Sequence, residues 1–270
     1  MISDSPVEPR KTALITGASS GLGAEFARQL SARGYDLIIV ARREDRLEQL
    51  KEELLASYAV SVTICQADLS IMENIEALTQ VIHRTPGVEM LVNNAGFGLR
   101  GRFYRVDADK ELALLMVHMV APVMLCRAAL PGMLERKLGY IINVSSMTGL
   151  IPIRTVLYGT SKNYLVRFSE ALQAELQDTQ VHVQALCPGY VLTEFHDTAE
   201  YTQFSRTSIP AFLWLTAPQV VSESLKSLGN RRVLCIPGNI YKVAGALSRN
   251  SLTLGLVTFI ARRIRRRRQP

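Results

Sequence analysis

Lys11-Thr-Ala-Leu-Ile-Thr16 runs directly into Gly17-Ala-Ser-Ser-Gly21-Leu-Gly23, and this stretch decides the fold. An apolar run, a glycine turn and a helical pattern that ends at Gly34 predict a strand, a turn and a helix. Glycines let a backbone approach a pyrophosphate closely, and the first N–H groups of the following helix attract its charge. The spacing differs from the common G-x-G-x-x-G, but the strand, turn and helix context is the same. A plain loop is the alternative to a dinucleotide site built from Gly17, Ser19, Ser20, Gly21, Leu22 and Gly23.

Two arginines follow the second predicted strand, Tyr35 to Ala41. An acidic residue at this strand end would bond a ribose 2′-hydroxyl, whereas an arginine accommodates a 2′-phosphate. Because Arg42 and Arg43 stand there and no acid does, the sequence favours NADP(H) over NAD(H) as the cofactor. The alternative is that these arginines merely begin the charged helix predicted from Glu44 to Leu55.

Strand and helix patterns alternate along the rest of the chain, without an internal repeat or a long flexible linker. The further predicted strands are Val60 to Asp68, Glu89 to Asn93, Gly139 to Ser145, Val181 to Cys187 and Arg232 to Ile236. This alternation predicts an α/β fold, a doubly wound parallel sheet in one domain over residues 1–250. Ligands of such sheets bind beyond the carboxyl ends of the strands, where Gly17, Asp68, Asn94, Ser145 and Pro188 all fall.

Polar residues stand at two of these strand ends. Asp68 and Leu69 follow the third strand, where an adenine edge could be met, but Asp68 could equally cap a helix over about 71–84. Asn93-Asn94-Ala95-Gly96 follows the fourth strand and suits close approach to a ligand, with a simple turn as the alternative.

Tyr158 and Lys162 lie four residues apart in a helix predicted near 155–176, so they share one face. A phenol titrates near pH 10, and a nearby cation favours the phenolate. Bringing that pKa to about 7 takes roughly 4 kcal/mol, at ~1.36 kcal/mol per unit. Tyr158 is therefore a candidate general acid/base, although a tyrosine and a lysine at this spacing usually form an ordinary surface pair.

Taken in order, these motifs resemble those of the short-chain dehydrogenase/reductase family over roughly residues 11–195. The matching segments are Thr16 to Gly23, Asp68, Asn93 to Gly96, Ser145, Tyr158-x-x-x-Lys162 and Pro188-Gly189. The resemblance implies a Rossmann-like sheet and NAD(P)-dependent oxidoreduction of a carbonyl or alcohol, with Arg42 at the position that usually marks NADP preference. It implies Tyr158 as acid/base, Ser145 on the substrate oxygen and Lys162 on the nicotinamide ribose. Pro188, Gly189, Val191 and Thr193 would contact the nicotinamide end.

One position departs from the family pattern. The family usually carries an asparagine in the long helix after Asn-Asn-Ala-Gly, where it helps to hold a water that leads to the lysine. Here His118 stands at that place, in a helical pattern over 108–135 that we expect to bend near Pro122 and Pro131-Gly132. Imidazole could keep the proton relay and add a titration near neutral pH, or His118 could be a packed side chain with no part in proton transfer.

Residues 194–217 contain seven aromatic or leucine side chains that the family would place in a mobile substrate lid. An aromatic lid suggests a small hydrophobic carbonyl or alcohol substrate, although half of these residues could be ordinary core. The family also implies a homodimer or homotetramer through the helices near 108–134 and 155–176. The rival function is a catalytically silent dinucleotide-binding regulator or scaffold that uses its basic tail.

The net charge of +7 is concentrated at the C-terminus. Six arginines lie at 262, 263 and 265–268, which leaves about +1 for residues 1–261, so a nucleic-acid-binding fold is not expected. The tail, residues 251–270, also contains the apolar run Leu252 to Ala261, which is shorter than the ~20 residues that span a bilayer. It suits peripheral contact with an anionic membrane, or packing on its own domain or in an oligomer.

The four cysteines are widely spaced and form no metal-ligand cluster. They read as buried free thiols in a reducing compartment. The opening Met1 to Pro9 has no charged segment followed by an apolar one, so it does not resemble a secretory signal. A cytoplasmic protein, with or without membrane association through its tail, is the expectation.

Overall fold

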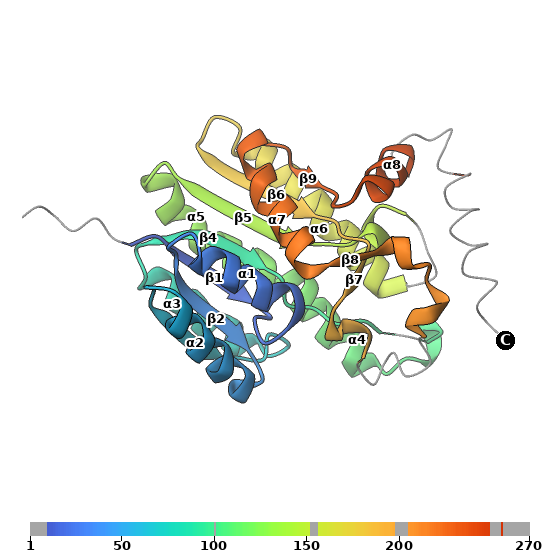
Figure 1. Cartoon of the computed structure of the whole chain (residues 1–270), viewed down its shortest axis with the longest axis horizontal. Coiled ribbons are helices and arrows are strands. Elements are labelled where there is room, and N and C mark those ends of the chain that lie inside the picture. The colour runs from blue at the N-terminus through green and yellow to red at the C-terminus, as the bar shows by residue number, and fades with distance from the viewer. Residues whose placement is uncertain (1–9, 100, 152–155, 198–204, 249–254, 256–270) are drawn as a thin grey trace, which may run out of the picture.

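The computed structural model describes residues 10–99, 101–151, 156–197, 205–248 and 255. At its centre is a sheet of seven parallel strands in the order β3-β2-β1-β4-β5-β6-β9, with helices on both faces (Figure 1). The strands are β1 (Thr12–Thr16), β2 (Asp36–Ala41), β3 (Val62–Gln66), β4 (Val88–Asn93), β5 (Gly139–Val144), β6 (Val181–Leu186) and β9 (Leu234–Cys235). The main helices are α1 (Gly21–Ser31), α2 (Glu44–Ser57), α3 (Met72–His83), α4 (Ala108–Leu115), α5 (Ala121–Glu135), α6 (Val156–Glu175), α7 (Ala217–Ser227) and α8 (Asn239–Ser248). The predicted Rossmann-like single-domain fold is confirmed.

The sheet forms because its strands are apolar on both faces. Every residue of β1 and of β6 is buried, as parallel strands covered by helices require. β1 lies centrally, paired in register with β2 from Thr12 opposite Asp36 to Thr16 opposite Val40, and also paired with β4. The strand order reverses between β1 and β4, so their carboxyl ends flank the crevice in which such sheets bind ligands.

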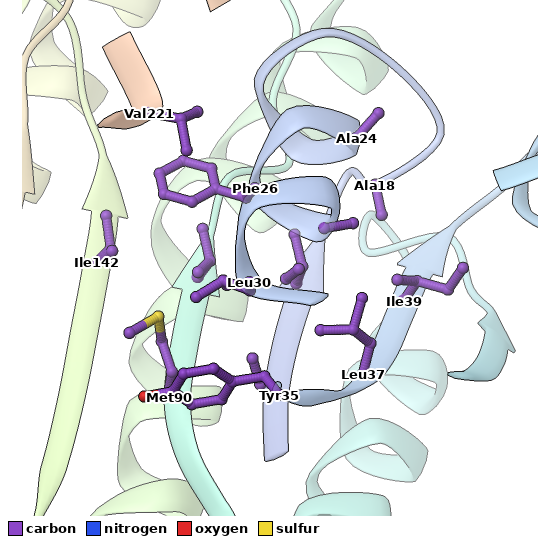
Figure 2. Close-up of a cluster of buried hydrophobic side chains, with 14 of the residues drawn as sticks. Ala18, Ala24, Phe26, Leu30, Tyr35, Leu37, Ile39, Met90, Ile142 and Val221 are labelled. Carbon is purple, nitrogen blue, oxygen red and sulfur yellow. The ribbon is translucent and has the colours of Figure 1, made fainter. Parts of the chain in front are cut away.

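Two clusters of buried side chains form the hydrophobic core. One packs α1, α2 and α7 against one face of the sheet, and the other packs α3 and α5 against the opposite face. Figure 2 shows Phe26 and Leu30 of α1 lying over the sheet residues Met90 and Ile142, with Val221 of α7 beside Phe26. Phe26 and Leu30 are fully buried, and each such side chain contributes about 1.5–3 kcal/mol of transfer free energy. This packing fixes α1 and therefore the direction of the glycine turn that precedes it.

The long helical pattern is interrupted once, close to Pro122. α4 leads into a π-helical turn, η2 (Met116–Val120), and then into α5. The departure from α-helical geometry thus lies next to Pro122, as expected, whereas α5 continues through Pro131 and Gly132. Among the described residues, Ala108–Glu135 is the one helix long and apolar enough to cross a membrane, yet half of its most apolar window is buried in this fold.

A second, two-stranded parallel sheet was not foreseen. It pairs β7 (Tyr190–Leu192) with β8 (Trp214–Thr216), and the rings of Tyr190 and Trp214 lie 5.5 Å apart. Tyr241 of α8 ties this sheet to the last helix, because its hydroxyl donates to Leu213 O (2.6 Å) and accepts from Tyr190 N (3.1 Å). Part of the expected lid, residues 198–204, and all of the tail except Gly255 lie outside the described residues.

Candidate active site

The glycine turn leads from the end of β1 at Thr16 to the start of α1 at Gly21. Gly17 has φ +66°, and a Cβ there would lie 2.8 Å from Ala95 Cα. A Cβ on Gly23 would collide with the carbonyl oxygen of Gly17. Any larger residue would therefore open the turn, so its glycines are required by close packing as well as by backbone conformation.

Asn94 holds this turn from the neighbouring strand β4. Its amide donates to Thr16 O (2.9 Å) and Gly17 O (3.1 Å). The hydroxyl of Thr16 accepts from Asn94 N and Ala95 N, both at 3.0 Å. Asn94 thus fastens β4 to the turn instead of reaching out to a ligand. Thr16, which the sequence did not mark as a site residue, accepts the other hydrogen bonds that join β4 to the turn.

The N-terminus of α1 suits a pyrophosphate. No side chain caps this eleven-residue helix, so its first N–H groups and its dipole remain available to an anion. The hydroxyls of Ser19 and Ser20 instead both accept from Arg43 Nη2 at 3.1 Å. The residues present therefore fit the phosphate end of a dinucleotide.

The two arginines after β2 have separate partners. Arg43 lies over the glycine turn and also forms an ion pair with Glu194 at 3.2 Å. Arg42 is mostly exposed and lies 3.6 Å from Asp68. Of the pair, Arg43 is the one beside the hydroxyls that precede α1.

Asp68 closes a turn rather than capping α3, whose N-cap is Ile71. Its Oδ1 accepts from Ser70 N (2.9 Å) and Ser70 Oγ (2.7 Å). Although burial raises the pKa of the Asp68 carboxyl, these hydrogen bonds and the Arg42 guanidinium hold it below its ordinary value. Leu69 is buried in the core, so only its backbone could meet a cofactor.

Tyr158 and Lys162 lie on successive turns of α6, as predicted from their spacing. Lys162 Nζ lies 5.8 Å from the centre of the Tyr158 ring. The ammonium is 4% exposed and donates to Val144 O at 2.8 Å. Burial lowers the pKa of Lys162 to about 8. A cation in this position is what the predicted acid/base role of Tyr158 requires.

Ser145 and Ser146 follow β5 and differ in what their hydroxyls do. Ser145 is buried, and its Oγ donates to Lys162 O at 2.7 Å. Ser146 is only partly buried; its Oγ accepts from Thr148 N at 3.2 Å, and the described residues supply no acceptor for its O–H. Ser145 was expected to bind the substrate oxygen, but its hydroxyl already donates its proton to a backbone carbonyl of α6.

His118 lies in the π-helical turn with no exposed surface. Its Nε2 accepts from Phe97 N (3.2 Å), and its Nδ1 lies 2.9 Å from Ser161 Oγ. Because Ser161 donates to Tyr158 O, the Nδ1 proton points at Ser161 and the ring is neutral. Burial, and then the Lys162 charge, keep the pKa of His118 well below its ordinary value, which favours the alternative of a packed histidine over a titration near neutral pH.

His118 still belongs to the site. Its ring lies 5.6 Å from that of Tyr158, in an edge-to-face arrangement. A Cβ on Gly96 would lie 2.8 Å from His118 Nε2 and 3.4 Å from Lys162 Nζ. Gly96 therefore leaves the space in which the imidazole and the ammonium approach each other.

The segment after β6 reaches the site from the other side. Pro188 O accepts from Met147 N (2.9 Å), and Gly189 packs so closely on the Tyr241 ring that no Cβ would fit. Thr193 lies against the glycine turn, since a Cβ on Gly21 would be 3.1 Å from Thr193 Cβ. Val191 is buried in β7, so its side chain serves packing.

Residues 11–203 match the family model described as short chain dehydrogenase. The chain belongs to the short-chain dehydrogenase family. A "Dehydrogenase/reductase SDR family protein 7-like" of Anopheles gambiae is 35% identical over 190 residues, covering 68% of this chain and 60% of that protein. An "Inactive hydroxysteroid dehydrogenase-like protein 1" of Homo sapiens is 33% identical, covering 67% of this chain and 56% of that protein. The chain thus spans under two thirds of either relative's length.

Among solved structures, this chain is similar to a short-chain dehydrogenase from Sphingobium yanoikuyae in complex with NADPH. The two are 30% identical with a TM-score of 0.79, over 85% of this chain and 88% of that one. The family resemblance inferred from the ordered motifs is therefore confirmed. The match covers the glycine turn, the strand ends and the Tyr158 helix together.

The buried ammonium of Lys162 is expected to make the stability of the protein depend on pH. Between its folded pKa of about 8 and its ordinary value of ~10.4, the unfolded chain binds more protons than the folded one. The free energy of unfolding of the wild type therefore rises with pH through this window, while Lys162→Met lacks this contribution. The stability of Lys162→Met relative to wild type is expected to fall by up to roughly 3 kcal/mol between pH 7 and 10.5.

Urea unfolding at pH 7, 8.5 and 10 measures this difference. The exposed Lys226 of α7 supplies the matched control, Lys226→Met, whose stability relative to wild type should change little with pH. A Lys162→Met difference that is as flat as the control would contradict the lowered pKa.

Proposed function

We propose that the protein is an NADP(H)-dependent oxidoreductase that transfers a hydride between the nicotinamide and the carbonyl or alcohol carbon of a hydrophobic substrate. The observation that carries this proposal is the placement of Tyr158 over a buried Lys162, at the same sheet edge as an uncapped helix N-terminus behind a glycine turn. A binding protein would not need a buried, hydrogen-bonded ammonium beside a phenol. Acid/base chemistry does.

The cofactor supplies the hydride when it is bound. The N–H groups at the start of α1 would hold its pyrophosphate, with Thr193 close to the same turn. Lys162 would donate to the nicotinamide ribose from Nζ while it stays anchored to Val144 O. Arg43, with Ser19 and Ser20, would hold the 2′-phosphate that distinguishes NADP(H) from NAD(H).

The preference for NADP(H) is expected to depend on Arg43 more than on Arg42. Arg43→Ala should raise the KM for NADPH about 10–100-fold and leave the KM for NADH nearly unchanged, since charged hydrogen bonds contribute ~1.5–3 kcal/mol. Arg42→Ala is the matched control, because its guanidinium faces Asp68 at 3.6 Å. Steady-state kinetics with both cofactors measure the effect. If Arg42→Ala, and not Arg43→Ala, raised the KM for NADPH, the 2′-phosphate would have to be assigned to Arg42.

The proton of the reduction would come from Tyr158. Its hydroxyl donates the proton to the oxygen of the substrate carbonyl as negative charge develops there, and Lys162 stabilises the phenolate that remains. Ser146, whose O–H lacks an acceptor among the described residues, would donate a second hydrogen bond to that oxygen. Ser145 would fix the strand to α6 beneath it through Lys162 O.

A hydrophobic substrate is supported by the rings around Tyr158. The Phe195 ring lies 6.0 Å from the Tyr158 ring, and the Phe97 ring lies 6.0 Å from that of His118. These aromatic side chains come from the segments after β4 and β7. NADPH oxidation followed with a panel of bulky ketones and aromatic aldehydes tests the class, and activity confined to small polar carbonyls would count against it.

The rival function is a catalytically silent dinucleotide-binding regulator. The similarity to a relative named as inactive supports this rival function. A regulator would need neither Tyr158 nor Lys162, whereas here both are present and adjacent. Cofactor binding without turnover of any substrate in the panel would favour the regulator.

We further propose a homo-oligomer and peripheral membrane contact for a cytoplasmic protein. The outward half of the apolar helix Ala108–Glu135 supports a second copy packed on α4 and α5. On α8, which precedes the polybasic tail in the sequence, Ile240, Val243 and Leu247 are exposed along one side, which supports a lipid-facing surface on this helix. Flotation with anionic liposomes, with and without residues 251–270, tests the membrane contact.

A further inference from the structure

A cavity of about 230 Å³ opens at the sheet edge opposite the proposed cofactor site. It lies at the amino ends of β5 and β6, where Tyr140 and His182 stand opposite each other in the paired strands. Its lining includes Lys137, Tyr140, Gln180, His182, Leu228 and Arg231. None of them belongs to the glycine turn or to the Tyr158 helix.

Both cations of this cavity stand on backbone positions that favour glycine. Lys137 follows α5 with φ +53°, and Arg231 follows the short helix Leu228–Asn230 with φ +50°. Lys137 N donates to Leu134 O (3.1 Å) and Leu138 N to Met133 O (3.0 Å), which is the usual left-handed helix ending. A glycine would adopt this conformation without strain. The backbone is therefore strained at both Lys137 and Arg231, whose side chains line the same cavity.

Neither cation is neutralised by the residues that the structure describes. No carboxylate lies within ion-pair distance of Lys137 or Arg231 in those parts of the chain, and Arg231 donates to Gln180 Oε1, a neutral acceptor. Two uncompensated positive charges at the rim of a small concave site attract an anion. The guanidinium fork suits a planar carboxylate, which it can bind through two N–H groups.

His182 adds an unsatisfied polar group to the same wall. The side chain is 3% exposed, and neither ring nitrogen has a hydrogen-bond partner among the described residues. Burial, and then the charge of Arg231, lower its pKa, so the imidazole is neutral with one donor and one acceptor. Buried polar groups are nearly always paired, so the unpaired His182 ring is an unfavourable feature of this wall.

We propose that this cavity binds a small organic carboxylate, with the carboxylate held by Arg231 and Lys137 and an aromatic or branched apolar group held against Tyr140 and Leu228. The volume is below the roughly 300–1,000 Å³ of drug-sized ligand sites, so the ligand is small. The buried His182 ring forms the inner wall of the site. The site is separate from the proposed oxidoreductase chemistry and does not depend on it.

Calorimetric titration of the full-length protein in the presence of NADPH tests the proposal, with benzoate and isovalerate as probes. Benzyl alcohol is the uncharged counterpart of benzoate, and inorganic phosphate is the anion without an apolar group. Lys137→Gly and Arg231→Gly are expected to weaken benzoate binding at least tenfold. Because each replaces a left-handed residue with glycine, each should also keep the ligand-free Tm or raise it, by up to about 4 °C.

Arg232→Gly removes the neighbouring exposed cation, which does not line the cavity, and should leave the Kd for benzoate within twofold of wild type. His182→Phe places a larger apolar ring in the wall and should abolish binding. Loss of binding in Lys137→Gly and Arg231→Gly with the Tm retained supports the site. Three results would each overturn it: unchanged benzoate affinity in both variants, equal binding of benzyl alcohol or phosphate, or no binding of either carboxylate to the wild type.

Discussion

Tyr158→Phe is expected to reduce kcat/KM for carbonyl reduction about 10²–10⁴-fold, the range typical of a lost general acid. The substitution removes the hydroxyl and leaves the ring, so the contacts with His118 and Phe195 at 5.6 and 6.0 Å persist. Lys162 also keeps its bond to Val144 O. The KM for NADPH and the unfolding temperature should therefore change little. Single-turnover oxidation of NADPH with the best ketone of the panel measures the chemical step directly.

Turnover that persists in Tyr158→Phe would refute the proton-transfer role. Tyr164→Phe is the matched control, because Tyr164 lies on the same helix with its ring stacked on Phe168, 5.9 Å away. The control should keep full activity. If both variants lost activity together, the cause would be damage to α6 rather than the missing phenol.

Ser146→Ala is expected to lower kcat about 10²–10³-fold, the loss typical when one donor to a developing oxyanion is removed. Ser145→Ala should instead act on stability. It removes the bond from Ser145 Oγ to Lys162 O, worth ~1 kcal/mol, and should lower Tm by about 2–4 °C with kcat within a fewfold of wild type.

Measuring kcat and Tm for both serine variants separates the two roles. The pair is a matched test, since the residues are adjacent and the substitution is the same. A large loss of kcat in Ser145→Ala with little effect in Ser146→Ala would return the substrate-binding role to Ser145. A change in Tm without a change in kcat in both variants would exclude a serine donor altogether.

The strands and the doubly wound class of the sheet could be predicted because each strand carries its own signal. β1, β2 and β6 are continuous apolar runs, and the helices between them restrict the topology to a doubly wound sheet. The pairing of β7 with β8 could not be predicted. Each of those strands has three residues, and what holds them is a distant contact, the Tyr241 hydroxyl between Tyr190 N and Leu213 O.

At the site, the sequence identified residues better than it assigned roles. Asn94 was expected near a ligand, but its amide is consumed by Thr16 O and Gly17 O. Spacing could not distinguish Ser145 from Ser146, because the choice depends on which hydroxyl meets the carbonyl of Lys162. The π-helical turn that buries His118 depends on packing around the turn, so a periodicity of 3.6 residues gave no sign of it.

The ion pair between Arg43 and Glu194 has a consequence for the proposed binding of the cofactor. Both side chains are nearly half exposed, so the pair contributes under about 1 kcal/mol and a phosphate can displace the carboxylate. The segment around Glu194 would stay in place after this exchange, because Arg206 also donates to Thr193 O (2.9 Å) and to Asp197 (2.6 Å). Glu194 repels the incoming phosphate and so offsets part of its attraction to Arg43. Added salt should therefore lower the association rate of the dinucleotide less than it would if Arg43 acted alone.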